Sequence, residues 1–309
     1  MSCAVGIDVG GTAVKLGLVS AEGRVLARAA LPSRAYDSFE ALLAALAAAI
    51  ADMGGRPQAV GIATPGYAEP AEGRLGVGAQ NVPVLQGRRL GAALQARLDL
   101  PVRQINDGVA AALGELRFGA GRGLCRFAVI TLGTGVGGAV VIDGRPVMGE
   151  HGEPPEFGAM VLDAAGPLNY SGLRGTFEAY ACADGFARAH AAAGGADTCD
   201  VAALFARAVR SDPAARAAVD AVCRRIAQAC GTMINLLGLE ACLLGGGISG
   251  AGAALVDRVA AHLPAFTWPF LLDRARVARA ETGNDAGLLG AAMEALRPQH
   301  APAEGASFT

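Results

Sequence analysis

The sequence predicts an α/β protein with a duplicated half, and three observations lead to this. Two stretches, Val5 to Val19 and Phe127 to Gly144, are apolar runs interrupted by close-set glycines, the pattern of a strand, a tight turn and an antiparallel strand. Both stretches share one layout although they lie in different halves of the chain. A predicted strand, Pro101 to Ile105, is followed at once by an alanine-rich helix, Val109 to Leu116, which is typical of a mixed α/β sheet.

The glycine turns of the two hairpins are candidate phosphate-binding sites. Asp8 precedes Gly10-Gly11-Thr12 in the first, and the second contains Gly133-Thr134-Gly135. Glycine has no Cβ between backbone and ligand, so successive N–H groups can face an anion. We therefore expect a nucleotide to lie between the two copies. The alternative, that both turns are ordinary hairpin loops, stays open at this point.

Two better-known nucleotide motifs fit less well. The second hairpin contains GTGVGG, a formal match to the dinucleotide fingerprint, but that motif needs a helix after its last glycine. Here the run Ala139 to Ile142 follows, and its β-branched valines and isoleucine favour a strand. The Walker pattern GxxxxGK[ST] is absent from the sequence. A Rossmann or P-loop enzyme is therefore disfavoured.

Composition narrows the function classes. A chain of 309 residues is long for one domain and comfortable for two, and 52% hydrophobic residues with 17% charged ones fit a well-cored globular protein. A net charge of −2 without Lys/Arg runs argues against a nucleic-acid surface. The chain enters a predicted strand within its first residues and has no uninterrupted apolar stretch of roughly 18–20 residues. We therefore expect a soluble, cytoplasmic protein.

Cysteines and histidines give no metal-site pattern. The seven cysteines include no CxxC pair, which in a chain of this length indicates reduced thiols. Cys223 and Cys230 share one helical face and are expected in the core. The four histidines lack metal-ligand spacing, so a structural zinc site is not expected.

The remaining elements follow from periodicity and turn residues. Trp268-Pro269-Phe270 is expected in a loop that covers the core, and residues beyond Arg297 are expected to be disordered. The predicted strands are Arg24 to Leu31 and Ala59 to Ala63, and the predicted helices are Ser38 to Met53, Gly87 to Leu98, Val201 to Val209, Pro213 to Leu237 and Ala286 to Leu296.

Asp107 lies at the end of a predicted strand and the start of a helix, and it has two interpretations. Asp is a favoured helix N-cap, and position alone favours that role. It could also serve as a general base that takes a proton from an attacking hydroxyl. The two roles are compatible, because a carboxylate near a helix N-terminus stays ionised.

Motifs along almost the whole chain resemble the ROK family of bacterial sugar kinases. In order they are DVGGTAVK, PGY, NVPVLQG, INDGVAAALGE, TLGTGVGG, EFGAM and LLGGGIS. The resemblance implies the two-domain actin-like ATPase fold, a duplicated ribonuclease H-like fold shared with hexokinases. It further implies a smaller α/β domain of residues 1–118 plus 286–298, a larger one of residues 119–285, and a disordered tail of residues 299–309.

The resemblance also assigns roles to individual positions. Asp107 corresponds to the catalytic base, and Asn106 beside it to a sugar ligand. The other positions that match sugar contacts are Gly66, Asn81, Glu156 and Glu178. The positions that match phosphate or nucleotide contacts are Asp8, Gly10, Gly11, Thr12 and Lys15 in the first turn, Thr134 and Gly135 in the second, and Gly245, Gly246 and Gly247 beside the adenosine. Magnesium is placed near Asp8.

The chain departs from the family pattern at three places. Ala159 stands where the family has a histidine that contacts both sugar and zinc, and all three cysteines of the zinc motif are replaced in the stretch Asn169 to Glu178. This indicates coherent removal of the zinc. We expect the loop to be held instead by packing or by hydrogen bonds of Asn169, Ser171 and Thr176. Leu85, where the family often has tryptophan, is interpreted as a packing substitution.

The resulting hypothesis is ATP- and Mg²⁺-dependent phosphorylation of a hydroxyl of a hexose or hexose-like sugar, by analogy the one on the terminal carbon. Glucose, an amino or acyl sugar and a cyclitol stay open as acceptors, and polyphosphate stays open as a donor. The alternative is a sugar-binding pseudokinase or a sugar-sensing protein, although the chain shows no basic arm. A homodimer is expected from the resemblance.

Overall fold

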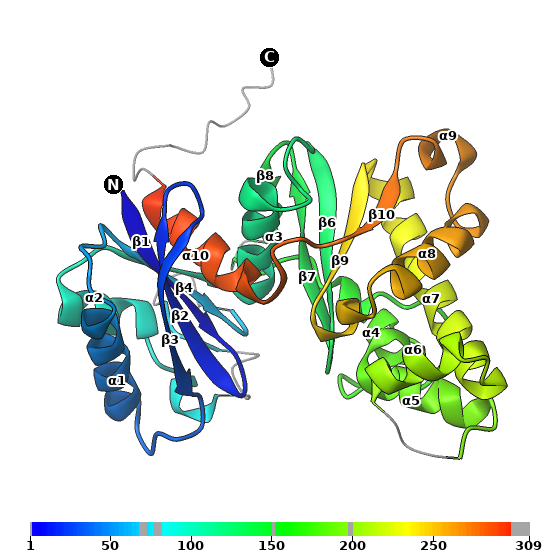
Figure 1. Cartoon of the computed structure of the whole chain (residues 1–309), viewed down its shortest axis with the longest axis horizontal. Helices are drawn as coiled ribbons and strands as arrows, with labels where there is room; N and C mark the ends of the chain where they lie inside the picture. Colours follow the sequence, from blue (N-terminus) through cyan, green and yellow to red (C-terminus); the bar gives the residue numbers. More distant parts are fainter. Residues whose placement is uncertain (1, 68–72, 77–81, 150–151, 197–199, 298–309) are drawn as a thin grey trace. The chain divides into compact units, whose positions relative to one another are not determined.

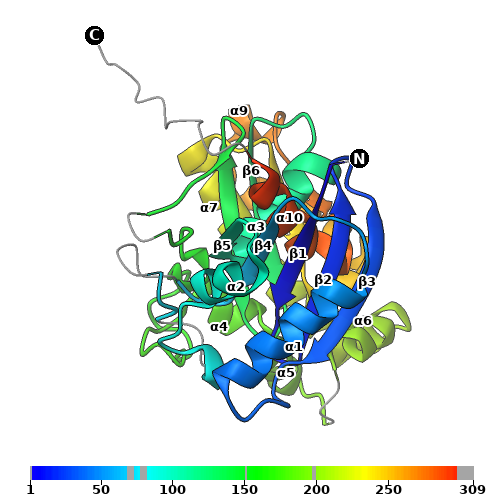
Figure 2. The same ribbon diagram turned by 90° about the vertical axis from the view of Figure 1, so that its left-hand side faces the viewer.

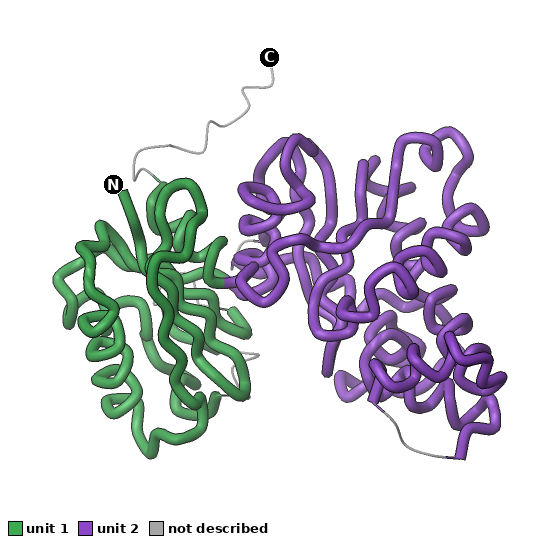
Figure 3. The backbone as a smooth tube through the Cα atoms, in the orientation of Figure 1, with its two compact units in different colours: residues 1–105, 288–309 green, residues 106–287 purple. Residues whose placement is uncertain are grey.

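The computed structural model describes residues 2–67, 73–76, 82–149, 152–196 and 200–297. The chain forms two compact units (Figure 3), one of residues 1–105 and 288–309 and the other of residues 106–287. It passes from unit 1 to unit 2 between Ile105 and Asn106 and returns between Gly287 and Leu288. Each unit contains one five-stranded mixed sheet with helices, so the predicted α/β class is confirmed.

The sheet of unit 1 is built around the first hairpin (Figure 1). Its strand order is β3-β2-β1-β4-β5, with β1 antiparallel to β2 and parallel to β4. The strands are β1 (Cys3–Val9), β2 (Ala13–Ser20), β3 (Val25–Pro32), β4 (Val60–Thr64) and β5 (Val102–Asn106).

Alternate residues of β1 point to opposite faces of this sheet. Val5, Ile7 and Val9 belong to a core that includes residues of α1 (Phe39–Asp52) and α2 (Leu90–Leu98). The intervening Gly6 faces α10 (Ala286–Leu296), where an added Cβ would lie 1.9 Å from the Leu288 carbonyl oxygen. Figure 2 shows α1 lying across this sheet. Helices therefore cover both faces.

The sheet of unit 2 repeats the arrangement, with order β8-β7-β6-β9-β10 when read in the same direction. Again the first strand of the hairpin pairs antiparallel with the second and parallel with a later strand. The strands are β6 (Arg126–Leu132), β7 (Val136–Ile142), β8 (Arg145–Pro146), β9 (Ala241–Gly245) and β10 (Arg276–Arg279). The predicted duplication is therefore confirmed.

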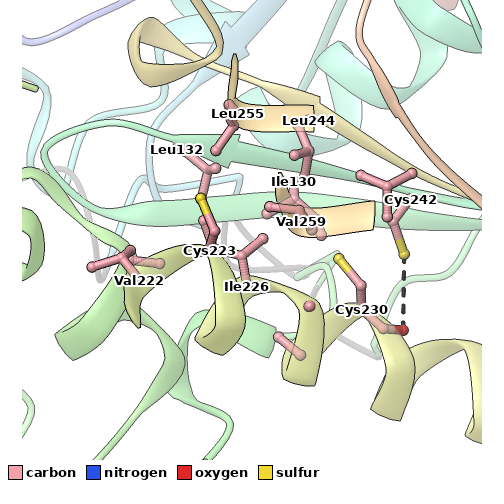
Figure 4. Packing of buried hydrophobic residues seen from close by; sticks show 14 of the residues in the cluster. Ile130, Leu132, Val222, Cys223, Ile226, Cys230, Cys242, Leu244, Leu255 and Val259 are labelled. Atoms are coloured by element: carbon pink, nitrogen blue, oxygen red, sulfur yellow. Dashed lines mark hydrogen bonds between the residues drawn. The ribbon is translucent and has the colours of Figure 1, made fainter. Parts of the chain in front are cut away.

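The core of unit 2 lies between this sheet and α7 (Pro213–Leu237). Figure 4 shows Cys223, Ile226 and Cys230 of α7 pointing toward Ile130 and Leu244 of the strands. Both cysteines are fully buried, as predicted. The other helices of this unit are α3 (Asp107–Phe118), α4 (Phe177–Ala181), α5 (Ala183–Ala192), α6 (Val201–Val209), α8 (Ala253–His262) and α9 (Pro269–Leu272), and short 3-10 turns cover Phe157–Ala159, Gly247–Ala251, Leu263–Ala265 and Gly283–Asp285.

Most predicted elements are present, with boundaries shifted by a few residues. The helices predicted at Pro213 to Leu237 and Ala286 to Leu296 have those limits in the structure. Leu85 in the 3-10 turn Pro83–Leu85 is 1% exposed, which fits a packing substitution. None of the helices among the described residues is long and apolar enough to cross a membrane. The predicted disordered tail lies outside the described residues from 298 onward.

One prediction about packing is wrong. Trp268 and Phe270 do not cover the core, because they are 62% and 52% exposed. Pro269 occupies the first turn of α9, and the rings of Trp268 and Phe270 contact each other with a tilt of 41° and 5.3 Å between centroids. Apolarity alone predicted burial, whereas the short helix turns both rings outward.

Candidate active site

The first glycine turn is closed by backbone hydrogen bonds and held by a serine from the end of β3. The Gly10 N–H donates to the Ala13 carbonyl oxygen at 3.0 Å. The Ser33 hydroxyl donates to the Gly10 carbonyl oxygen at 2.5 Å, and its N–H donates to the Thr12 carbonyl oxygen at 3.1 Å. Three residues of the turn region are thus fixed by contacts within unit 1.

Two charged side chains flank this turn. Asp8 and Lys15 face each other across the β1–β2 ladder, with 3.8 Å between Lys15 Nζ and Asp8 Oδ2. The Asp8 side chain is 21% exposed. Burial raises the pKa of Asp8 above its usual 3.8, and the charge of Lys15 offsets part of this rise. A second cation near Asp8 would favour its ionised form further.

The second glycine turn is held by one hydrogen bond of its own and by two bonds to residues outside its hairpin. The Gly133 N–H donates to the Gly135 carbonyl oxygen at 3.0 Å, and the Ala183 N–H donates to the Gly133 carbonyl oxygen at 2.9 Å. The Val136 N–H donates to Glu178 Oε2 at 2.9 Å. The support therefore comes from α4, from the N-terminus of α5 and from the turn itself.

The Gly245–Gly247 segment lies beside this turn. Gly245 pairs with Thr131 in the parallel β6–β9 ladder. Gly246 has φ of 77°, and an added Cβ would lie 2.4 Å from the Leu132 carbonyl oxygen, so only glycine fits. Two of the predicted nucleotide-contact segments are thus neighbours within unit 2.

Asn106 and Asp107 mark the start of α3. Asn106 is the N-cap, since its Oδ1 accepts from the N–H groups of Gly108 at 2.8 Å and Val109 at 3.3 Å. Asp107 is the first helical residue, and its Oδ1 accepts from the Gly108 N–H at 2.8 Å. The expectation that Asp107 caps the helix is therefore wrong. The preceding amide takes that place, and the Asp107 side chain is exposed.

Helix α3 begins in close contact with the strand that leaves the second turn. A Cβ added at Gly108 would lie 2.6 Å from the Gly138 carbonyl oxygen of β7. The backbone of the first turn of α3 thus approaches β7 more closely than any side chain would allow. Asp107, the residue before Gly108, therefore lies close to β7 within unit 2.

Glu178 is held at both carboxylate oxygens. Besides the bond from Val136 to Oε2, Asn169 Nδ2 donates to Glu178 Oε1 at 3.2 Å and to Thr176 Oγ1 at 2.9 Å. Thr176 caps α4 by accepting from the Ala179 N–H at 3.2 Å. The expected hydrogen-bonded loop is present through Asn169 and Thr176. Ser171 contributes its backbone N–H, which donates to Asn169 Oδ1 at 3.4 Å.

The negative charge of Glu178 affects the protonation of Glu156 and Tyr170. Partial burial, and then the Glu178 carboxylate, raise the pKa of Glu156 above its usual value. The Glu178 carboxylate is the main cause of the raised pKa of Tyr170, with burial and Glu156 adding to it. Three polar groups therefore share one electrostatic neighbourhood, and Ala159 lies in the 3-10 turn that follows Glu156.

The structure distributes the predicted site residues between the two units. Unit 1 brings together Asp8, Gly10, Gly11, Thr12 and Lys15, while Gly66, with φ of 79°, follows β4. The second turn, the Gly245–Gly247 segment, Asn106, Asp107, Glu156 and Glu178 all belong to unit 2. Asn81 lies outside the described residues.

Ser33 was not anticipated as a support of the first turn. Its bonds to Gly10 and Thr12 join residues far apart in sequence, and no local motif signals them.

Comparisons with known proteins match over nearly the whole chain. A model of the ROK family matches residues 4–297. The glucokinase of Thermotoga maritima is 32% identical over 303 residues, which cover 93% of this chain and 95% of that protein. The N-acetylmannosamine kinase of Escherichia fergusonii is 32% identical over 289 residues, covering 93% and 96% respectively. The crystal structure of a ROK family glucokinase from Streptomyces griseus in complex with glucose and AMPPNP superposes with a TM-score of 0.80 at 29% identity, covering 96% of this chain and 100% of that one.

Proposed function

Because the chain belongs to the ROK family, we propose that it is an ATP-dependent kinase that phosphorylates a hydroxyl group of a hexose or hexose-like sugar. The family assignment confirms the resemblance stated from the motifs, and with it the actin-like ATPase fold. Relatives named glucokinase and N-acetylmannosamine kinase favour this function over a sugar-binding pseudokinase or a sugar sensor.

The observation that carries the proposal for this chain is the environment of Asp107. Asp107 is exposed at the start of α3, where Asn106 is the N-cap and Asp107 Oδ1 accepts from the Gly108 N–H at 2.8 Å. The same helix start packs on β7, the strand that leaves the Gly133–Gly135 turn. An exposed carboxylate near the strand that leaves a candidate phosphate turn is suited to act as a general base for phosphoryl transfer.

In the proposed reaction, the sugar hydroxyl oxygen bonds to the γ-phosphorus of ATP while the bond from that phosphorus to the bridging oxygen breaks. ADP leaves with the electron pair, and Asp107 accepts the hydroxyl proton. Asn106, Glu156 and Glu178 would orient the sugar by accepting and donating hydrogen bonds to its hydroxyls, together with Gly66 and Asn81. The turns Gly10–Thr12 and Gly133–Gly135 would hold the phosphates through backbone N–H groups, with Lys15 adding charge and Gly245–Gly247 lying beside the adenosine.

Magnesium fits the residues near the first turn. Asp8 is a partly buried carboxylate whose pKa is raised, so a divalent cation would stabilise its ionised form. No group of three or more metal-binding side chains occurs in the part of the chain that the structure describes. This fits Mg²⁺, which usually binds through one or two carboxylates together with water and phosphates. When bound, it would neutralise charge that develops on the phosphates.

The acceptor is proposed from the polar groups around Glu178. Glu156, Glu178 and Tyr170 provide hydrogen-bonding groups, whereas Ala159 offers only a methyl group. We therefore propose relaxed or shifted specificity where a family histidine would contact the sugar, so that an amino or acyl sugar or a cyclitol is a candidate besides glucose. The phosphate donor is ATP in this proposal, with polyphosphate as the alternative to be tested.

We also propose that the enzyme needs no zinc. The hydrogen bonds of Asn169 to Thr176 and Glu178 supply a support for the loop that does not require a metal. The Asn169 N–H further donates to the Leu173 carbonyl oxygen at 2.7 Å, which closes the loop on itself. Elemental analysis of the purified protein tests this, and stoichiometric zinc that survives dialysis against a chelator would contradict it.

We further propose that the protein forms a homodimer and is located in the cytoplasm. The dimer rests on the family resemblance, and sedimentation equilibrium of the purified protein would detect it. A mass equal to that of one chain at micromolar concentration would contradict the dimer.

The experiment that tests the proposed activity is a coupled ADP-release assay with a panel of hexoses, amino sugars, acylated amino sugars and cyclitols. We expect saturable, Mg²⁺-dependent turnover with at least one sugar, and product identification by NMR gives the phosphorylated carbon. A parallel set of reactions with polyphosphate in place of ATP identifies the donor. Sugar binding by calorimetry without turnover for any acceptor and either donor would instead support the pseudokinase.

A further inference from the structure

The buried carboxylate of Glu115 has no role in the proposed reaction, although it lies on the helix that begins with Asp107. Glu115 is 0% exposed. An ionisable side chain is almost never so deeply buried unless it is fully paired or hydrogen-bonded. Its partners therefore indicate what the burial achieves.

Glu115 accepts hydrogen bonds from four donors. Oε2 accepts from the N–H groups of Ala120 at 2.8 Å and Glu281 at 3.1 Å. Oε1 accepts from the Thr282 N–H at 2.7 Å and from the Thr282 hydroxyl. Both oxygens thus bind residues that lie after β10, far from Glu115 in the sequence, and the carboxylate connects the end of α3 to that segment.

Small residues allow this connection. A Cβ added at Gly119 would lie 2.1 Å from Glu115 Oε2, so the carboxylate fits only against glycine. A Cβ added at Gly114 would lie 2.5 Å from the Ala286 carbonyl oxygen, at the start of α10. Helix α3 therefore contacts the segment 281–286 at two successive residues. The backbone of Gly114 lies against Ala286, and the buried carboxylate of Glu115 binds residues 281 and 282.

The segment that Glu115 binds leads directly to the point where the chain leaves unit 2. The chain enters unit 2 at Asn106, immediately before α3, and leaves it after Gly287. Glu115 thus joins, within unit 2, the helix that starts at the entry and the segment that precedes the exit. The start of α3 lies against β7, where Gly108 contacts Gly138, and the helix also packs on β6.

We propose that Glu115 is a positioning residue for the proposed general base: it fixes the axis of α3 by holding segment 281–286, and so sets where Asp107 lies. This rests on the proposed function of Asp107. The effect is expected in the chemical step, because a displacement of about 1 Å at a reacting group can reduce the rate by about 10²-fold. The affinities for sugar and nucleotide are expected to change little, because none of the proposed ligand contacts is made by Glu115.

The test compares Glu115→Gln with the wild-type enzyme. The amide keeps the shape but turns an NH₂ group toward N–H donors that need an acceptor. We expect kcat to fall by about 10-fold or more, with the KM values for sugar and ATP within about 2-fold of wild type. Glu294→Gln is the matched control. It removes a carboxylate that pairs with Arg103 at 3.2 Å in unit 1, and kcat should stay near the wild-type value.

Hydrogen–deuterium exchange gives a readout that does not depend on activity. In Glu115→Gln, amides of residues 107–118 and 280–287 should exchange at least about 10-fold faster, while those in the middle of α7 stay unchanged. If Asp107→Asn leaves kcat unaltered, the proposed function fails, yet the exchange result still decides whether Glu115 holds α3.

A second variant keeps the inference testable if Glu115→Gln does not fold. Thr282→Val removes only the hydroxyl bond to Oε1 and leaves the backbone bonds in place. It should lower kcat by about 2- to 5-fold and raise exchange in the same two segments. A folded variant of either kind with wild-type kcat and wild-type exchange would overturn the inference. KM values for both substrates that rise as much as kcat falls would also overturn it.

Discussion

The two glycine turns occupy equivalent places in equivalent sheets, yet they are built on different chemistry. Next to the first turn, the last pair but one of the hairpin ladder is Asp8 and Lys15. In the second, the same positions hold Thr131 and Gly137. The first turn thus carries its own charges, whereas the second receives a carboxylate from Glu178 of α4 through the Val136 N–H. A duplicated fold conserves the backbone path, while the charge that surrounds each turn is supplied separately.

This difference suggests a division of labour. A charged pair on the first turn suits metal-bound phosphates, as proposed for Asp8. An uncharged second turn joined to Glu178 suits a site where the phosphate to be transferred meets the sugar. Substitutions in each turn test whether the two turns differ in this way.

Asp8→Asn should have the largest effect among the turn variants. We expect turnover to fall on the order of 10²-fold, because the proposed Mg²⁺ ligand is lost. Thr131→Val is the matched control at the equivalent position of the second turn, and its loss should stay below about 3-fold. Steady-state kinetics with varied Mg²⁺ checks both. Equal losses in the two variants would remove the distinction between the turns.

Asp8→Asn should also stabilise the ligand-free protein at neutral pH. The pKa of Asp8 is raised by folding, so ionised Asp8 costs stability above its folded pKa and costs nothing below 3.8, the usual value. The gain in Tm should therefore be present at pH 7 and disappear on acidification below that value. A Tm difference that does not depend on pH would contradict the assigned cause.

Gly135→Ala should destabilise the second turn by about 1–3 kcal/mol. Its Cβ would lie 2.7 Å from Glu178 Oε2 and would displace the carboxylate that holds Val136. Gly133→Ala, in the same turn, would place its Cβ in open space and should change ligand-free stability by less than about 0.5 kcal/mol. Thermal unfolding without ligands provides the measurement. Similar values for the two would show that Glu178 does not support this turn.

Asn169→Ala should have a smaller effect, expressed on the sugar side. It removes the amide that donates to Thr176 and Glu178, each bond contributing about 0.5–1.5 kcal/mol. We expect the KM for the sugar to rise about 3- to 10-fold with little change in the KM for ATP. Ser171→Ala in the same loop is the control, since the Asn169 contact of Ser171 uses its backbone N–H. A changed KM for ATP alone would argue against this role.

The smallest expected change concerns Glu156. The Glu178 carboxylate contributes to its raised pKa, after burial. In Glu178→Gln that contribution disappears, so the pKa of Glu156 should fall toward its usual value, and carboxyl ¹³C NMR titration can follow it. An unchanged pKa of Glu156 in Glu178→Gln would show that the Glu178 carboxylate does not act on Glu156.

The fold could be predicted largely because its signals are local. The helix Pro213–Leu237 has Asp212 as N-cap, Pro213 in its first turn and Gly238 in the left-handed conformation after its end, and all three are readable in the sequence. Likewise Ser38, at which the predicted helix begins, caps α1. The N-cap of α3 was expected one residue too late, at Asp107, because Asn and Asp are both good caps and only the backbone conformation selects Asn106.

The supports of the candidate site could not be predicted, because they are long-range. The motif that contains Asp107 also contains Glu115, yet the partners of Glu115 at residues 281–282 have no periodic relation to it. The bond between Glu178 and Val136 likewise connects two separate motifs. Glycine spacing predicts where a backbone can approach a ligand, whereas the side chain that holds that backbone is chosen by tertiary packing.

The most direct test of the account is the Asp107→Asn variant, assayed for turnover and for nucleotide affinity with the best sugar from the panel. The account predicts that kcat falls on the order of 10²-fold or more, because the base for the hydroxyl proton is lost. The affinity for a non-hydrolysable ATP analogue, measured by calorimetry, should stay within about 2-fold of wild type. A variant that turns over at a near-wild-type rate would contradict the assignment of Asp107, and with it the proposed mechanism.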